Sequence, residues 1–281
     1  MTEEQMLKAF LSEDIRYVAH RFGYKTSRLP ENSFAALKAI FADEEFLGSI
    51  DSFEFDFNIT KDGHLVVVHD VNLAKLSNCD KNVYDLTLEE FKKVEFSYRV
   101  GDENKTNEVF YAPTLIEVLD YFNQRVELLE GKTIRVESKG DEYLSMDLIP
   151  AFIKVLKDYP NLHKHIQHIT FMDEFINQFD QLKKKYDIKI PNEKLFWYDW
   201  VDELVPQNEL FELVGMEHNN RHLTNEYVRN WNHVCFYTVN GKKEILELLE
   251  IVEPAAFKGK KIYLTTDDYR EIEKLKKMYC S

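Results

Sequence analysis

Apolar and polar positions alternate between two patterns from one end of the chain to the other. Short runs rich in Val, Ile, Phe and Tyr have the composition of β-strands. Longer stretches with apolar residues three and four positions apart have the pattern of amphipathic helices. We expect eight strands, at Tyr17–His20, Ser52–Phe57, Thr133–Glu137, His168–Phe171, Lys194–Tyr198, Leu213–Glu217, His233–Thr238 and Lys261–Thr265.

A helix is predicted after each strand or close to it. In the stretch Glu31–Asp43 the large apolar residues share one face, and Thr114 is the expected N-cap of a helix at Leu115–Phe122. The predicted helix Asn208–Val214 overlaps the predicted strand Leu213–Glu217, so one of these boundaries is wrong. The remaining expected helices are Leu144–Tyr159, Asp173–Tyr186, Asn208–Val214, Thr224–Trp231, Lys242–Val252 and Asp267–Met278.

This regular alternation predicts parallel strands joined by crossover helices. Eight such units fit an α/β fold of the TIM (β/α)8 barrel type, and a doubly wound open sheet is the alternative. The first dozen residues predict an extra helix that would plug the bottom of the barrel. Because no linker, low-complexity tract or internal repeat interrupts the pattern, we expect residues 1–281 to form a single domain.

One segment departs from the alternation. Asp62-Gly63 stands between two strand-like runs, which is a strong hairpin signal. The hairpin would fold the chain back and return His69 to the end of the second strand. Residues 71–112 then form a long polar excursion, which we interpret as a small insertion on the active face, since loops of this length are usually functional.

The charge of the chain narrows its possible partners. It has 281 residues, with 36 Lys and Arg against 50 Asp and Glu, and a formal charge of −14. A chain this acidic repels phosphate backbones and anionic membranes, so we expect no nucleic-acid partner. A small anionic substrate remains compatible, because a few cations or a metal can reverse the field inside one cleft.

Cysteine usage and the N-terminus indicate the compartment. Cys79, Cys235 and Cys280 are odd in number and widely spaced, which predicts neither a disulfide framework nor a zinc site. The N-terminus lacks the basic and apolar regions of a signal peptide, and no stretch has the apolar length of a membrane span. We therefore expect a cytoplasmic protein with reduced thiols and no stable membrane insertion.

Glu54 and Asp56 are the first candidate site residues. They alternate with Phe53, Phe55 and Phe57, so a strand would place both carboxylates on one face and the rings on the other. Paired carboxylates inside a barrel are costly, and a divalent cation offsets that cost. All-oxygen ligands favour Mg²⁺ or Ca²⁺. The alternative is a strand with one face in solvent.

Other polar residues are expected at the same end of the strands. Glu137 would be a third metal ligand, and Lys139 on the same face would meet a phosphate oxygen. His20 and Arg21 end the first strand, where barrel enzymes carry their catalytic groups. Two histidines, His20 and His69, are suited to act as acid and base across a phosphoryl group. Each motif alone is also typical of a solvated strand end.

Taken together, these motifs resemble those of the glycerophosphodiester phosphodiesterase family, within the phospholipase C-like phosphodiesterase superfamily. They follow the family's order over nearly the whole chain. The residues that carry the resemblance are Ala19-His20-Arg21, Pro30-Glu31-Asn32-Ser33, Glu54-x-Asp56, Asp62-Gly63, Val68-His69-Asp70, Asp85 to Glu90, Pro113-Thr114-Leu115, Glu137-x-Lys139, Thr238-Val239-Asn240 and Thr266-Asp267.

The resemblance implies a TIM barrel that hydrolyses glycerophosphodiesters to glycerol 3-phosphate and an alcohol, with attack by the glycerol 2-hydroxyl as a first step. It implies one divalent cation and assigns the site residues. The metal ligands would be Glu54, Asp56 and Glu137; the acid/base pair His20 and His69; and the phosphate- or substrate-binding residues Arg21, Glu31, Asn32, Lys139 and Tyr237.

The chain departs from the family pattern at two positions. Phe22 stands between Arg21 and Gly23, where the family reads His-Arg-Gly, so a tight turn near the phosphate is expected to be altered or shifted. Tyr237 stands where the family usually has tryptophan, and it would form a wall of the substrate pocket. Residues 171–230 match loosely, and this half is expected to define specificity for the alcohol.

Three alternatives remain open at this stage. A lysophospholipase D or sphingomyelinase D-like enzyme would share the barrel, the metal and the histidines, and it would need an apolar groove for an acyl chain. A phosphoinositide-cleaving lipase fits the motif order less well. A non-catalytic phosphodiester-binding barrel is the alternative from another class. The leaving alcohol, the choice of Mg²⁺ or Ca²⁺ and the oligomeric state are not defined by the sequence.

Overall fold

The computed structural model describes residues 1–97, 109–140, 147–196 and 213–280. Within these residues eight parallel strands close into a barrel, because β1 pairs with both β9 and β2. This is the predicted TIM barrel, and it excludes the open sheet. The barrel strands are β1 Asp14–Ala19, β2 Ser52–Ile59, β4 Thr133–Ser138, β5 Ile166–Thr170, β6 Asn192–Phe196, β7 Leu213–Glu217, β8 His233–Tyr237 and β9 Lys261–Thr266.

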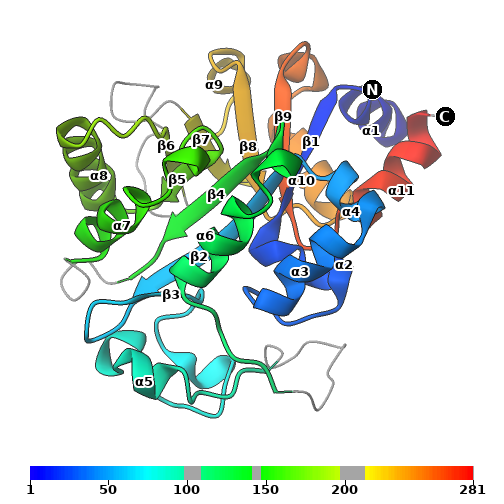
Figure 1. The fold of residues 1–281 in the computed structure, drawn as a ribbon. Helices are drawn as coiled ribbons and strands as arrows, with labels where there is room; N and C mark the ends of the chain where they lie inside the picture. The colour runs from blue at the N-terminus through cyan, green and yellow to red at the C-terminus, as the bar shows by residue number, and fades with distance from the viewer. Residues whose placement is uncertain (98–108, 141–146, 197–212, 281) are drawn as a thin grey trace.

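Helices surround the barrel (Figure 1). None of the helices in the described part of the chain combines the length and apolar character that crossing a bilayer requires. The α-helices are α1 Glu3–Leu11, α2 Tyr24–Ser27, α3 Phe34–Ala42, α4 Glu44–Ser49, α5 Leu88–Phe91, α6 Leu115–Asn123, α7 Leu148–Leu156, α8 Asp173–Lys185, α9 Asn225–Arg229, α10 Lys242–Ile251 and α11 Tyr269–Cys280.

Capping side chains explain where two of the helices begin. Thr114 caps α6 as predicted, in a capping box with Glu117. The helix expected from Glu31 begins only at Phe34, because the Ser33 hydroxyl accepts a hydrogen bond from the Ala36 amide and acts as its N-cap. The residues before Ser33 therefore lie in the loop that precedes α3 and not in the helix.

One helix prediction was wrong where it can be compared with the structure. The stretch Asn208–Val214 was expected to be helical, but Leu213 and Val214 lie in β7, where Leu213 pairs with Glu193 of β6. Residues 208–212 of that prediction lie outside the described residues, as do 144–146 of the predicted helix Leu144–Tyr159 and 197–198 of the predicted strand Lys194–Tyr198. Pairing with a neighbouring strand overrode the local helical pattern.

The extra N-terminal helix is present. In α1, Leu7, Phe10 and Leu11 are fully buried. The ring of Phe10 lies 5.0 Å from that of Phe257, which precedes β9, and the helix packs beside α11 (Figure 1). The helix therefore covers the N-terminal end of the barrel wall, opposite the ends of the strands that carry the candidate site.

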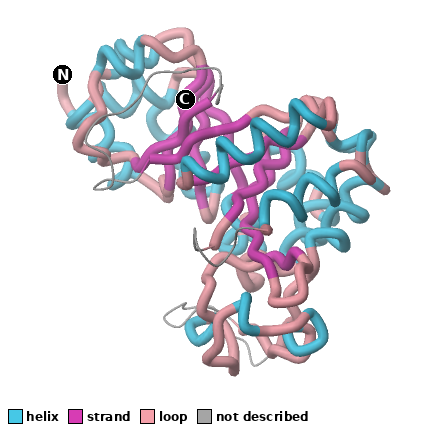
Figure 2. The backbone as a smooth tube through the Cα atoms, turned by 90° about the vertical axis from the view of Figure 1, so that its left-hand side faces the viewer, coloured by secondary structure: helices cyan, strands magenta, loops and turns pink. Residues whose placement is uncertain are grey.

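The predicted hairpin joins β2 to β3, Leu65–Val67, which pairs antiparallel to it. The segment that follows extends from one end of the barrel (Figures 1 and 2). Its sequence is largely polar, but its apolar residues form a hydrophobic cluster that the sequence did not predict. The cluster comprises Val66, Val68, Leu73, Leu76, Val83, Leu86, Phe91, Val94, Phe96 and Ala112.

The phenyl rings of β2 anchor the strand that carries the first two candidate ligands. Phe53, Phe55 and Phe57 are fully buried on the outer face of the strand. Phe53 lies 5.0 Å from Phe122 of α6, and Phe57 lies 4.7 Å from Phe152 of α7, between ring centroids. Burial of each ring contributes about 1.5–3 kcal/mol, so the inward direction of Glu54 and Asp56 is firmly fixed.

His168 of β5 makes the folded state sensitive to acid. Its ring is fully buried, stacks on Phe179 at 4.3 Å, and bonds Ser138 and Asn192. Burial lowers its pKa from 6.5 to about 4. As pH falls from 6.5 to 4, the unfolded chain gains a proton here that the folded chain does not, so stability is lost in that window.

We expect this one residue to account for up to about 3 kcal/mol of the loss. Urea unfolding at several pH values between 7 and 4 would measure it, with His168→Gln as the comparison. The difference in the free energy of unfolding between the wild type and the variant should change as the pH falls from 6.5 to 4. Parallel curves would contradict the prediction.

Candidate active site

Three buried carboxylates meet on the inward faces of β2 and β4. Asp56 and Glu137 are paired in the strand register, and Glu54 lies one inward position earlier on β2. Ligand oxygens of the three lie within 4.8 Å of one another. Their exposed fractions are 3% for Glu54, 1% for Asp56 and 7% for Glu137. This is the cluster that the sequence predicted as a metal site.

Burial and mutual repulsion change the pKa values of the three carboxylates. Burial raises the pKa of Glu54 well above its usual range, and the neighbouring carboxylates add to the effect. Burial also raises the pKa of Glu137, to about 7, against the opposing effect of Lys139. Burial would raise the pKa of Asp56 as well, but the cationic side chains around it outweigh this and hold it low.

A divalent cation fits this donor set. Among the described residues, Glu54 Oε1 is buried without a hydrogen-bond partner. An unpaired buried carboxylate oxygen is costly, and hard cations such as Mg²⁺ and Ca²⁺ take carboxylate oxygens as ligands. The residues present therefore match the group that the sequence implied.

Two cationic side chains flank the carboxylates. Lys139 pairs with Glu137, and its Nζ lies 3.4 Å from Asp56 Oδ1. The Arg21 guanidinium donates to Glu31 Oε1 at 2.7 Å, and its Nε lies 3.6 Å from Asp56 Oδ2. Both cations line the cavity above the carboxylates, so they are positioned to meet an anion there.

Glu31 and Asn32 support the site from the loop before α3. The Asn32 amide donates to Asp56 Oδ2 at 2.8 Å, and its carbonyl accepts from the Asp56 backbone amide. Asn32 has a φ of 56°, a left-handed conformation that asparagine tolerates. Their contacts are with Arg21 and Asp56, and among the described residues they line a separate notch and not the main cavity.

The turn after β1 carries the departure at Phe22. Arg21, Phe22 and Gly23 have φ values of 49°, 64° and 58°, so three successive residues are left-handed. This conformation is strained for the first two residues. The Phe22 ring is fully buried, 5.0 Å from Phe55, and the Arg21 amide donates to Glu54 Oε2 at 2.8 Å. These contacts offset the strain.

His20 is held by a carboxylate from the residue that follows the last barrel strand. Its Nδ1 lies 2.6 Å from Asp267 Oδ1. The other carboxylate oxygen of Asp267 lies 2.7 Å from Lys25 Nζ and accepts from the Asn240 amide at 3.0 Å. Burial would raise the pKa of Asp267, but the bond to His20 and the nearby cations hold it well below its usual range. Nε2 of His20 is left for the cavity.

His69 has a similar arrangement with its neighbour in sequence. Its Nδ1 lies 2.5 Å from Asp70 Oδ1, and the Asn58 amide, on β2, donates to the backbone carbonyl of His69 at 3.3 Å. Burial lowers the pKa of His69, as does the charge of Lys139. The hairpin therefore returns His69 to the end of β2, as expected from the sequence.

These groups surround a cavity of about 300 Å³. Tyr237 lines it, with its hydroxyl donating to the Phe196 carbonyl at 2.5 Å and its ring edge-on to Phe171. The residues that line the cavity are His20, Arg21, Glu54, His69, Arg135, Glu137, Lys139, Ile169, Phe171, Glu193, Leu195, Glu217, Cys235, Tyr237, Thr238 and Thr265.

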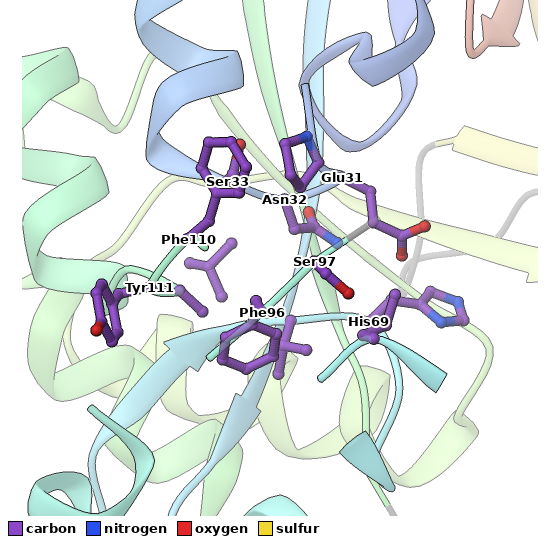
Figure 3. A pocket seen from close by; sticks show the side chains of 13 residues that line it. Glu31, Asn32, Ser33, His69, Phe96, Ser97, Phe110 and Tyr111 are labelled. Atoms are coloured by element: carbon purple, nitrogen blue, oxygen red, sulfur yellow. The ribbon is translucent and has the colours of Figure 1, made fainter. Parts of the chain in front are cut away.

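A small notch adjoins His69 on its far side. It lies between the loop of residues 30–33 and the insertion, and its volume is about 20 Å³. Figure 3 shows the side chains of Glu31 and His69 on one side of the notch and Tyr111 on the other. The volume is close to that of one water molecule.

Sequence reasoning did not assign roles to Asp70 and Asp267, although both stood in the family motifs. Asp267 is 247 positions away from its partner His20. The signal that could have located it was an acidic residue two positions after the last predicted strand, because parallel barrel strands end at one rim.

Asp267→Asn is expected to lower kcat by about 100-fold with little change in KM, since the asparagine no longer holds the histidine in one tautomer. Steady-state kinetics would measure both constants. Asp268→Asn is the matched control, because Asp268 bonds Thr26 and not His20. An equal loss in both variants would indicate a general disturbance of the loop and contradict the role.

The fold and the ionisable groups gathered near the carboxyl ends of its strands define a TIM-barrel protein with an enzyme-type site. The family model of the glycerophosphoryl diester phosphodiesterase family matches residues 20–252. The chain belongs to this family, which confirms the resemblance seen in its motifs.

Individual relatives agree with this membership. A glycerophosphodiester phosphodiesterase of Caldanaerobacter subterraneus subsp. tengcongensis is 34% identical over 142 residues, covering 50% of this chain and 52% of the relative. One from Bacillus altitudinis is 33% identical over 125 residues, 44% of this chain and 45% of the relative. The matches therefore span about half the length of these curated relatives.

Solved structures share the fold over almost the whole chain. A Silicibacter pomeroyi structure that carries the same family name has a TM-score of 0.75 at 18% identity, covering 99% of this chain and 98% of the other. An Oleispira antarctica phosphodiesterase, solved with its product sn-glycerol-3-phosphate, has a TM-score of 0.64 at 20% identity, covering 92% and 96%.

Proposed function

We propose that this protein hydrolyses glycerophosphodiesters to glycerol 3-phosphate and an alcohol, with one divalent cation, and that residues 1–281 act as a single domain. The observation that carries the proposal is the meeting of two carboxylate-paired histidines with the carboxylate cluster and two cations around one cavity. Family membership and the product bound to the Oleispira relative support the same substrate class.

Glu54, Asp56 and Glu137 would hold the cation. When bound, Mg²⁺ or Ca²⁺ supplies positive charge for the phosphoryl oxygens. Arg21 and Lys139 donate hydrogen bonds to the same phosphate, and their charge stabilises the negative charge that grows on it. Glu31 and Asn32 keep Arg21 and Asp56 in place for this role.

His20 and His69 would transfer the protons. One takes the proton of the attacking glycerol 2-hydroxyl, and the other gives a proton to the leaving alkoxide, so that this step leaves a cyclic phosphate. Water then opens the cyclic phosphate to glycerol 3-phosphate. The carboxylate behind each ring holds Nδ1 as the donor, so Nε2 is the atom that exchanges the proton. Tyr237 forms part of the wall that positions the alcohol.

A lyso-lipid substrate would need a long apolar groove for its acyl chain next to the phosphate. Among the described residues, the notch beside His69 measures about 20 Å³ and is lined in part by Phe96 and Tyr111. A deacylated diester requires no such groove, and we propose it as the substrate.

An assay on a panel of glycerophosphodiesters, with detection of glycerol 3-phosphate, tests the proposal. Release should disappear with EDTA and return with Mg²⁺ or Ca²⁺. A lyso-glycerophospholipid in the same panel tests the alternative enzyme. No release from any diester with either cation would refute the proposed function.

A further inference from the structure

A group of lysines gathers at one end of the barrel, in a chain that is otherwise strongly acidic. Helices α7 and α8 lie side by side (Figure 1). The first ends shortly before β5 begins and the second shortly before β6 begins, so both ends lie opposite the rim that carries the cavity. We call the group the lysine face, and its members are Lys154, Lys157, Lys183, Lys184, Lys185, Tyr186 and Lys189.

Contacts between these side chains make them one surface. Lys157 Nζ lies 4.6 Å from the centroid of the Tyr186 ring, and Lys185 Nζ lies 5.3 Å from it, so the ends of the two helices meet at this ring. Tyr186 is 42% exposed. An adjoining hollow of about 400 Å³ is lined by other members of the group, Lys183, Lys184 and Lys189.

The local charge is opposite in sign to that of the whole chain. The ends of α7 and α8 and the loop after α8 contain three carboxylates, on Asp158, Asp180 and Asp187. Six lysines against three aspartates give a charge of +3, in a chain whose formal charge is −14. Asp180 is 4% exposed and already pairs with Lys184 at 2.7 Å. Charges farther than about 10 Å are screened at about 0.1 M salt, so a surface that touches the lysine face meets mainly positive charge.

The ends of the helices explain only part of this group. Cations in the last turn of a helix interact favourably with its dipole. That accounts for Lys154 on α7 and for Lys183 to Lys185 on α8. Lys189 lies in the loop after α8 and gains nothing from either dipole. Packing the two helix ends together also brings like charges close to one another, so the group is not arranged for stability alone.

We propose that the lysine face docks the protein on a bilayer that is rich in anionic phospholipids. Clusters of about four to eight basic residues are typical of surfaces that bind anionic lipids. Tyr186 adds an exposed ring with a polar tip, a side chain that is common at the boundary between lipid and water. The contact is peripheral, and it does not depend on the function proposed above.

The chemistry of the lysine face favours lipid over an acidic protein. Its cations are all lysines, which are flexible point charges, whereas fixed carboxylates in a protein partner are usually matched by the planar fork of arginine. Ammonium groups spread over two helix ends suit mobile headgroups. A second copy of this chain would have to bring a different, acidic face to the lysines, and such head-to-tail contacts build open chains unless they close into a ring.

The position of the lysine face leaves the cavity open to water while the protein is docked. The lysines lie at the amino ends of β5 and β6, and the candidate site lies at the other end of the barrel. A deacylated diester has no acyl chain and reaches the cavity from solution. Docking would therefore hold the protein beside a membrane without drawing its substrate from the bilayer.

Sedimentation with vesicles tests the inference. One set contains equal parts of phosphatidylglycerol and phosphatidylcholine, and the other contains phosphatidylcholine alone. At about 0.1 M NaCl the wild-type protein should bind the first set and not the second, and about 0.5 M NaCl should abolish the binding. Equal binding to both sets, or no binding to the anionic set, would overturn the inference.

A fourfold variant then locates the contact. Each lysine near an anionic surface contributes about fivefold to the association constant, so loss of four should reduce binding to the level of phosphatidylcholine vesicles. Full binding by this variant would overturn the inference. The substitutions, all at exposed positions, are Lys154→Gln, Lys157→Gln, Lys185→Gln and Lys189→Gln.

A matched control changes the net charge by the same amount at the other end of the barrel. It should bind anionic vesicles within about twofold of the wild-type protein. An equal loss in both variants would show that net charge alone decides, which contradicts a docking face. The control replaces exposed lysines of the hairpin turn and the insertion: Lys61→Gln, Lys75→Gln, Lys81→Gln and Lys93→Gln.

Other occupants of the lysine face would give different results. Light scattering without vesicles would detect a second copy, as an association of the wild-type protein that the fourfold variant lacks. Poly-L-glutamate represents an acidic protein, and tighter binding to it than to anionic vesicles would favour such a partner. Either result would overturn the inference. If the fourfold variant does not fold, Lys189→Gln alone should weaken vesicle binding by about fivefold, and unaltered binding would contradict the role of the lysine face.

Discussion

His20→Ala and His69→Ala should each lower the kcat for a glycerophosphodiester by about 10²–10⁴-fold, the usual contribution of a positioned acid or base. Each ring is held at Nδ1 by a carboxylate, and both histidines line the cavity. KM should change little, because Arg21 and Lys139 still hold the phosphate. Steady-state kinetics with glycerol 3-phosphate detection would measure both constants.

A second substrate would then separate the acid from the base. The 4-nitrophenyl ester of glycerol 3-phosphate has a leaving group that needs no proton. The variant that lacks the acid should recover most of its rate on this ester, and the variant that lacks the base should not. His64→Ala, an exposed histidine in the hairpin turn, is the control. Near-normal turnover of the alkyl diester by either variant would remove that histidine from the mechanism.

Glu54→Gln should abolish the gain in thermal stability that divalent cations give the wild-type protein. Outer-shell partners alone are worth about 10–100-fold in metal affinity, so loss of a direct ligand should weaken binding by about 100-fold or more. The wild-type protein should gain thermal stability when Mg²⁺ or Ca²⁺ is added, since the cation binds the folded state. Turnover of the variant should fall in parallel.

In EDTA the order of stabilities should reverse. Three buried carboxylates repel one another without the cation, and burial already raises the pKa of Glu54. The neutral amide relieves that repulsion, so the variant should melt at a higher temperature than the wild type. Thermal unfolding with and without cation, with the exposed Glu44→Gln as control, would show this. A cation-induced shift of equal size in the variant would mean that the ion binds elsewhere.

Local patterns were sufficient to predict the barrel and the inward carboxylates. Period-2 alternation defines the two faces of β2 irrespective of distant contacts, so Glu54 and Asp56 could be assigned to the interior. By contrast, Arg135 of β4 donates a hydrogen bond to Glu193 of β6, which lies 58 positions later in the chain. A pairing across the barrel leaves no local trace in one sequence.

Contacts between residues far apart in the chain also explain where the structure departs from the sequence-based predictions. The stretch before β7 has a helical pattern, but Leu213 pairs with β6, and a helix prediction does not include that pairing. The insertion reads as polar because its apolar residues are spread over many turns, and they gather into a cluster only on folding. The backbone angles at Phe22 likewise depend on a ring, Phe55, from another strand.

The separate hydrophobic cluster of the insertion has an evolutionary consequence. The segment is joined to the barrel where Val66 bridges Thr114 and where the Val67 amide bonds the Pro113 carbonyl. Its apolar residues pack mainly on one another and not on the barrel core. Mutations there can reshape the rim beside His69 while the strands that hold the carboxylates stay intact. Substrate range can thus diverge among descendants faster than the chemistry, because the two depend on side chains packed in different hydrophobic clusters.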